Sequence, residues 1–222
     1  MLSIDGLLSA DSQAAEFDRE KKFLKEFPSK QVRVLSPDLQ QGPDGWPYLL
    51  VEVCERGGEP AGGPLKWIAS RGVGMAINPG KLPDGAPEVV LTFGMAWNYG
   101  ETGELLASAE GAQPPEGASG DRPFNLRHGQ ALAAGAPSER HLPGYVRSVL
   151  RQFFLDQGVF APKVLMVAAD QINFDLCFSV ESLGSPPERE HGGILEALSW
   201  FLPPHYSLAL LSEKSVAGWQ PL

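Results

Sequence analysis

The sequence predicts an α+β protein with mixed or mainly antiparallel sheets and helices packed on one face. Two observations support this class. In several stretches apolar residues alternate with a period of two, as in half-buried strands. In others they recur at helical spacing, and Gly- and Pro-rich segments separate the two kinds. Helices that cover the apolar side of such strands build an α+β fold.

The composition indicates a folded protein with a hydrophobic core. Of the 222 residues, 43% are hydrophobic and 20% are charged, enough for one large domain or two small ones. The formal net charge of -9 repels polyanions, so we expect no nucleic-acid partner. We also expect no membrane span and no secretory signal. Cys54 and Cys177 lie in apolar runs rather than in a CxxC pair, which favours a reduced, cytoplasmic compartment.

In the N-terminal part we expect a helix at 11–27, strands at 31–36 and 48–53, a helix at 64–71 and a strand at 73–78. Pro28 ends the first helix, and Pro64 begins the second. Turn residues at 42–45 predict a hairpin between the first two strands. A further strand is expected from residue 88 and continues through 95–99.

In the C-terminal part we expect a helix at 142–157, strands at 163–169 and 174–180, a helix at 192–202 and a strand at 206–211. The first helix has a broad apolar face, and Gly158 follows its end. In the strand from 174 to 180, alternation directs Phe174, Leu176 and Phe178 toward the core.

The same order of elements occurs over residues 11–78 and 142–211: helix, strand, strand, Gly/Pro-rich joint, helix, strand. This predicts two related halves, although α+β chains also show such an order by coincidence. We therefore expect an N-terminal α+β half at 1–107 with extra strands at 88–99, a loop or linker at 108–137, and a C-terminal α+β half at 138–222. A lid or binding loop, or undetected structure, is the alternative for the middle segment.

Residues that commonly carry chemistry do not form a recognisable motif. The four histidines lie in or beside loops without metal-ligand spacing, so we expect no metal and no cofactor. Both cysteines are expected to be small buried hydrophobes. The glycine-rich joint at 57–63 lacks the ending of a phosphate-binding loop and is interpreted as a connector. No catalytic residue is assigned.

Candidate binding residues are aromatic or basic. Trp97 and Tyr99 alternate at the expected end of a strand and Trp46 begins another, which suits either core packing or a recognition groove. Arginines follow an acidic segment before and within the helix at 142–157, which suits either an anionic ligand or neutralisation within the chain. The candidate binding residues are Trp46, Trp97, Tyr99, His128, Arg140 and His141.

These observations favour a non-catalytic, cytoplasmic binding or regulatory protein that contacts a protein or a small molecule. The alternative is a hydrolase or transferase with a loop-built site between the two halves. A pocket that holds His128 or His141 against a carboxylate would favour the enzyme. An apolar patch without titratable groups would favour the binding protein.

Overall fold

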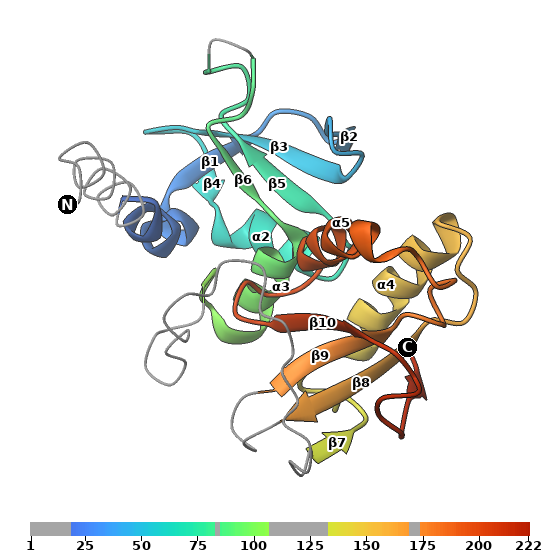
Figure 1. Ribbon diagram of the computed structural model, residues 1–222. Helices are drawn as coiled ribbons and strands as arrows, with labels where there is room; N and C mark the ends of the chain where they lie inside the picture. Colours follow the sequence, from blue (N-terminus) through green and yellow to red (C-terminus); the bar gives the residue numbers. More distant parts are fainter. Residues whose placement is uncertain (1–18, 83–84, 107–132, 169–173) are drawn as a thin grey trace, which may run out of the picture. The chain divides into compact units, whose positions relative to one another are not determined.

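The computed structural model describes residues 19–82, 85–106, 133–168 and 174–222 (Figure 1). It contains two mixed sheets with mostly antiparallel strands, together with helices, which confirms the α+β class. The chain divides into two compact units. Unit 1 comprises Met1–Ala69, Val73–Leu91 and Met95–Leu106, and unit 2 comprises Ser70–Gly72, Thr92–Gly94 and Ala107–Leu222.

Unit 1 is built on a sheet in which a hairpin is joined to a parallel strand. Residues 19–26 are helical. They are followed by η1 (Phe27–Ser29), β1 (Gln31–Val34), β2 (Gln40–Gln41), β3 (Pro47–Val53), β4 (Glu59–Pro60), α2 (Gly62–Ala69), β5 (Gly74–Ile77), β6 (Val89–Leu91) and α3 (Phe93–Thr102). The strand order is β4-β1-β3-β5-β6, and β2 also pairs with β3. The predicted hairpin is confirmed, because β1 and β3 are antiparallel.

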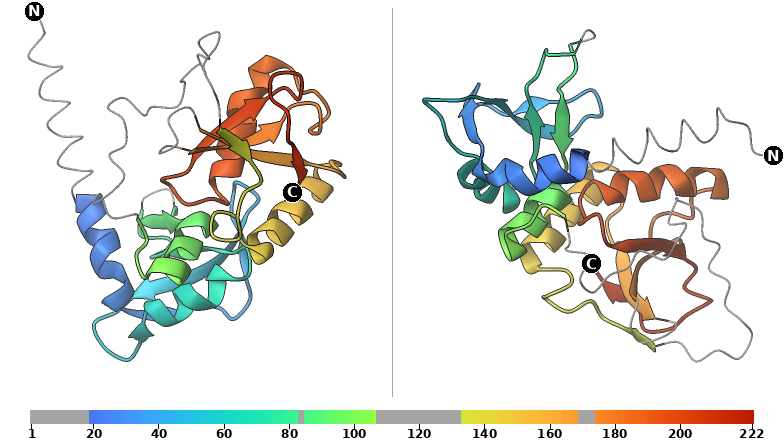
Figure 2. Two further views of the ribbon diagram at one scale, coloured as in Figure 1. Left: turned by 90° about the horizontal axis from the view of Figure 1, so that it is seen from below. Right: turned by 90° about the vertical axis from the view of Figure 1, so that its left-hand side faces the viewer.

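One face of this sheet carries the core of unit 1. The residues on that face alternate along each strand, and the strand register brings Val51 beside Ile77 and Leu49 beside Met75. Leu24 of the first helix, Leu65 of α2 and Ala96 of α3 belong to the same buried cluster. The helices of this unit therefore cover one face of its sheet, as the alternation predicts (Figure 2).

Gly74 shows why β5 can lie so close to its neighbours. A Cβ at this position would stand 2.7 Å from the ring of Tyr48 and 2.8 Å from the carbonyl oxygen of Leu91. Both distances are shorter than van der Waals contact, so only glycine fits here without displacing either neighbour.

The strand expected to continue through residues 95–99 is wrong, because residues 93–102 form helix α3 and only β6 is a strand here. Phe93, Ala96 and Trp97 are buried at positions i, i+3 and i+4, which is the spacing of a helix. The alternation of Met95, Trp97 and Tyr99 competes with this spacing. Short apolar runs fit both periods, and tertiary packing decides between them.

Asn78 fastens the end of β5 to β3. It has a left-handed backbone with φ of 51° and a side chain that is only 6% exposed. Its Oδ1 accepts a hydrogen bond from the Val53 N–H at 2.8 Å, and its Nδ2 donates to Glu88 Oε2 at 2.7 Å. Asparagine tolerates this backbone conformation better than most residues and supplies both a donor and an acceptor.

We expect Asn78→Ala to lower the free energy of unfolding by about 2–4 kcal/mol. The Val53 N–H loses its acceptor, and alanine keeps the strain of a Cβ in the left-handed region without the hydrogen bonds that stabilise asparagine there. Asn78→Gly should lose about 1 kcal/mol less, because glycine removes only the hydrogen bonds. Urea unfolding of both variants measures the difference. Equal stability of the two variants would show that backbone strain contributes nothing.

Unit 2 has a second sheet with a parallel pair at one edge. Its elements are β7 (Ala133–Gly135), α4 (Gly144–Asp156), β8 (Lys163–Ala168), β9 (Phe174–Ser179), α5 (Glu188–Ser199), β10 (Ser207–Leu211) and β11 (Gln220–Pro221). The strand order is β10-β9-β8-β11, and β7 also pairs with β8. The helix expected at 142–157 and the three expected strands are confirmed. β7 corrects the expectation of loop throughout 108–137, for residues 133–135; residues 108–132 lie outside the described part.

Both faces of the unit 2 sheet are packed. On one face, Cys177 of β9 joins Leu165 and Val167 of β8, and Trp219 covers this cluster. On the other face, the rings of Phe178 and Phe154 lie 5.8 Å apart, which places α4 there. The prediction that only one side of β9 faces a core is therefore incomplete, because both sides pack against other elements. Cys177 is fully buried, whereas Phe174 is 43% exposed.

The elements predicted for the two halves occur in the predicted order, but unit 1 also has β2 between β1 and β3, and β4 within the expected joint at 57–63. In unit 1, β3 pairs antiparallel with β1 and parallel with β5 after the α2 crossover. In unit 2, β9 pairs antiparallel with β8 and parallel with β10 after α5. A common origin of the halves stays a prediction, because similar order and pairing also arise independently.

Among the described helices, none combines the length and the apolar character needed to cross a bilayer.

A polar network joins the ends of β8, β9 and β10. Glu213 Oε2 accepts a hydrogen bond from Lys163 Nζ at 2.7 Å, and its Oε1 accepts one from the buried Ser179 hydroxyl at 2.6 Å. The Lys163 ammonium, and next the Ser179 hydroxyl, lower the pKa of Glu213. The Ser212 hydroxyl and then the Glu213 N–H lower the pKa of Glu181 in the same way.

Because the folded-state pKa of Glu213 lies below its unfolded value, its stabilising effect is present above the unfolded value and disappears as the pH falls through the folded one. We expect Glu213→Gln to lower the melting temperature at pH 7 and to reduce the loss of melting temperature between pH 5 and about pH 3. Thermal unfolding across this range is the measurement. Glu196→Gln, at an exposed position of α5, is the control and should change neither quantity.

Candidate functional site

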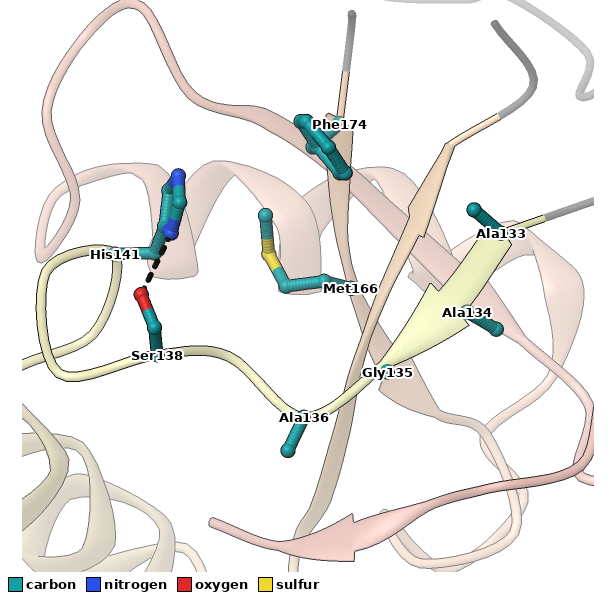
Figure 3. A pocket seen from close by; sticks show the side chains of 8 residues that line it. All are labelled: Ala133, Ala134, Gly135, Ala136, Ser138, His141, Met166 and Phe174. Carbon is teal, nitrogen blue, oxygen red and sulfur yellow. Dashed lines mark hydrogen bonds between the residues drawn. The ribbon is translucent and has the colours of Figure 1, made fainter. Parts of the chain in front are cut away.

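A pocket with a volume of about 320 Å³ lies in unit 2 (Figure 3). Its walls come from β7, the loop that follows it, β8 and the start of β9. The lining residues are Ala133, Ala134, Gly135, Ala136, Ser138, His141, Met166 and Phe174. Most of these side chains are apolar, and only Ser138 and His141 bring polar side-chain atoms.

The strand register explains why a hollow forms here. Gly135 pairs with Met166, which pairs in turn with Leu176, so these positions share one face of the sheet. On the same face, Ala133 and Phe174 both pair with Ala168. β7 contributes only small residues, and a Cβ at Gly135 would meet no atom within 4 Å. The face is therefore apolar but incompletely filled at this end.

The polar end of the pocket is a hydrogen-bonded pair. The Oγ of Ser138 lies 2.9 Å from Nδ1 of His141, and Figure 3 shows this bond at the side of the pocket that faces Met166. The imidazole also lies 6.1 Å from the ring of Phe174. Tyr206, just before β10, donates from its hydroxyl to the carbonyl oxygen of His141 at 2.7 Å. Residues distant in sequence thus hold His141 in place.

The loop that carries the pair is closed by local bonds. The carbonyl oxygen of Ser138 accepts from the N–H groups of His141 at 3.0 Å and Leu142 at 2.9 Å. Glu139 Oε2 accepts from the Gly144 N–H at 2.9 Å, at the first residue of α4. A carboxylate that bonds a free amide at a helix N-terminus also complements the helix dipole. Glu139 therefore stabilises the N-terminus of α4 and does not orient the His141 imidazole.

The aromatic candidates lie outside this pocket. Trp97 is 2% exposed in α3, and such a buried ring offers no surface to a partner. Tyr99 is partly buried and packs against the core of unit 1. Trp46 is half-buried at the turn before β3. Of the three, the structure favours core packing most clearly for Trp97.

The basic and histidine candidates are divided. His141 lines the pocket, Arg140 is exposed beside it in sequence, and His128 lies outside the described residues. Among described residues, no acid forms an ion pair with Arg140. Arg147 donates to the backbone carbonyl oxygens of Pro137 and Leu142, and Arg151 donates to the main-chain oxygen of Leu222. Within the described residues, neutralisation by acidic side chains is therefore not seen for these arginines, and an anionic ligand stays a hypothesis.

Ser138, Met166 and Phe174 were not identified as site residues from the sequence. The available signal was the small-residue run at 133–136, followed by a loop that contains a serine and a histidine three residues apart. That signal becomes a site only through the pairing of β7 with β8, which local periodicity does not predict. Alternation along the strand predicts Phe174 in the core. It identifies the face of the sheet on which Phe174 lies, but it does not show whether a helix covers that face.

Other reactive groups offer weaker sites. Within the described residues, no three His, Cys, Asp or Glu side chains are grouped to hold a metal ion. The His191 ring lies 3.1 Å from the Pro186 carbonyl oxygen, a contact within its own loop and helix. Burial raises the pKa of Cys177 to about 12, so its thiol stays protonated and unreactive at neutral pH.

The pocket can therefore enclose an apolar group and offer a hydrogen bond at one end. In the described part of the chain, His141 faces a hydroxyl and no carboxylate orients its ring. Base catalysis by histidine usually includes such an orienting group. Comparison with known proteins adds no functional information, since no protein-family model, curated protein or solved structure matches the chain.

Proposed function

We propose that the protein is a non-catalytic binding or regulatory protein that takes a small, mostly apolar ligand into the His141 pocket of unit 2. The observation that supports this proposal is the pocket itself: an apolar hollow with a polar pair at one end. Its volume of about 320 Å³ lies at the lower end of the range of ligand sites, roughly 300–1,000 Å³. A cytoplasmic location belongs to the same proposal.

The lining favours a ligand with two different ends. Met166 presents a flexible, polarisable thioether that adapts to the shape of a ligand. Phe174, which is 43% exposed, has ring surface that a ligand would cover. The Ser138–His141 pair can both donate and accept hydrogen bonds, so it suits a hydroxyl, amide or carboxylate at the other end.

The expected affinity for a bare fragment is weak. Each buried CH₂ contributes about 0.8 kcal/mol, and a dissociation constant of about 1 mM corresponds to about 4 kcal/mol. A ligand of benzyl size therefore reaches the millimolar range, and a natural ligand would need further contacts for tighter binding.

Benzyl alcohol is a suitable probe, because its ring matches the apolar lining and its hydroxyl matches the polar pair. We expect it to shift the ¹³C-methyl NMR signal of Met166, with a dissociation constant on the order of 1–10 mM. The chain has four methionines, so Met166→Leu assigns the signal. Saturable shifts at another methionine, with none at Met166, would contradict the proposal.

Filling the pocket provides the matching variant. Gly135→Leu places a side chain on the pocket face, where space is open, and should weaken benzyl alcohol binding at least about tenfold without unfolding the protein. Gly192→Leu is the control, because Gly192 in α5 also has open space around a Cβ and lies outside the pocket. Unchanged affinity in Gly135→Leu would place the binding site elsewhere.

The alternative is a hydrolase, and one observation favours it. A serine hydroxyl 2.9 Å from an imidazole nitrogen is the arrangement that activates a nucleophile, and it stands here beside an apolar pocket. In that case Ser138 would attack an ester carbonyl carbon, and His141 would take the hydroxyl proton. The alcohol would leave, and water would later release the acid from Ser138.

Hydrolysis of p-nitrophenyl acetate distinguishes the two functions. For a binding protein we expect the same slow hydrolysis rate from wild type and Ser138→Ala. A serine hydrolase would lose at least about 100-fold of its rate with this change. Ser148→Ala, on the exposed side of α4, is the control for a serine outside the pocket.

A further inference from the structure

We propose that Arg147 is a positioning residue that fixes the Ser138–His141 pair at the polar end of the pocket. Arg147 does not line the pocket. It acts through the backbone of the loop that carries the pair. Its effect on ligand affinity rests on the proposed function, whereas its effect on the geometry of the pair does not.

The guanidinium of Arg147 bridges the two ends of this loop. Its Nε donates to the carbonyl oxygen of Leu142 at 2.9 Å, and its Nη2 donates to the carbonyl oxygen of Pro137 at 2.6 Å. Pro137 and Leu142 are both buried, whereas residues 138–141 between them are exposed. One planar guanidinium therefore sets the separation of Pro137 and Leu142, between which Ser138 and His141 lie.

Arginine suits this role for a geometric reason. Its planar fork presents several donors in fixed directions, so one side chain can bond two carbonyl oxygens at once. A lysine at the same position has a compact ammonium on a flexible stem and would hold one carbonyl more readily than both. Helix α4 supplies the base, because Arg147 lies in its first turns and is only partly exposed.

The remaining ties of the loop do not replace this bridge. The bonds to the Ser138 carbonyl close a local turn, and Glu139 bonds the start of α4. Tyr206 holds His141 from outside the loop. Without Arg147 these contacts keep the chain folded, but the distance between Pro137 and Leu142 is less restricted. The Ser138–His141 hydrogen bond should then form for a smaller fraction of the time.

Arg151 provides a matched control one turn further along α4. Its Nε also donates to a main-chain oxygen, that of Leu222, at 2.5 Å. Neither Arg151 nor Leu222 lines the pocket. Changes at Arg147 and Arg151 thus each remove guanidinium hydrogen bonds to main-chain oxygen atoms from the same helix, two at Arg147 and one at Arg151, with and without a link to the pocket.

The experiment compares Arg147→Met, Arg147→Lys and Arg151→Met with the wild type. The ¹⁵N chemical shifts of the His141 ring report its tautomer and its hydrogen bond, and Ser138→Ala gives the pattern without that bond. Benzyl alcohol titration, followed on the Met166 methyl, gives the affinity. Melting temperatures show whether each variant is folded. If Arg147→Met does not fold, the comparison is made with Arg147→Lys.

We expect the His141 pattern of Arg147→Met to move toward that of Ser138→Ala, with an affinity at least threefold weaker, and Arg147→Lys to fall between. Arg151→Met should leave both quantities unchanged. An unchanged His141 pattern in both Arg147 variants overturns the proposal, and so does an equal change in Arg151→Met. If the wild type binds no benzyl alcohol while the His141 pattern still moves, positioning by Arg147 stands and the proposed function fails.

Discussion

The structure of unit 2 depends on the burial of β9 between two neighbours. β9 pairs antiparallel with β8 and parallel with β10, so its backbone hydrogen bonds are used on both edges. Its two faces both carry apolar side chains, and each face needs its own cover. Helix α4 contacts one face at Phe178, and Trp219 covers the other near Cys177. Phe174, at the start of β9, is 43% exposed and lines the pocket, which therefore forms where this apolar face is incompletely covered.

The pocket combines this uncovered face with a loop that is held from several directions. β7 brings no bulky side chain, so space remains above Met166. The loop after β7 places a hydroxyl and an imidazole beside that space. Hydrogen bonds from Arg147 and Tyr206 to the loop backbone determine where these groups stand. A binding site on a loop is well positioned only when other elements support it. Here α4 and Tyr206, just before β10, give that support.

Unit 1 has a similar strand pairing, but helical segments cover the apolar face of its sheet. β3 lies between an antiparallel and a parallel neighbour, and its apolar face is covered by helical segments in one cluster. Tyr48 packs closely against Gly74, and Asn78 ties β5 to β3. Of the aromatic candidates, Trp97 is 2% exposed and Tyr99 packs against the core, so these two rings contribute to packing. This distribution favours unit 2 as the site of ligand contact.

The sequence by itself determined the α+β class and the order of most elements, because these follow from local periodicity. It also named His141 as a candidate, and this residue lines the pocket; its role as a binding residue stays a prediction. It did not determine α3, because a short apolar run fits both a strand and a helix until packing chooses. Nor did it determine the pocket. Ser138, Met166 and Phe174 meet only because β7, β8 and β9 pair in a particular register. Arg147 becomes important only because the folded loop before α4 brings two backbone carbonyl oxygens within hydrogen-bonding distance of its guanidinium. Such contacts are properties of the tertiary structure.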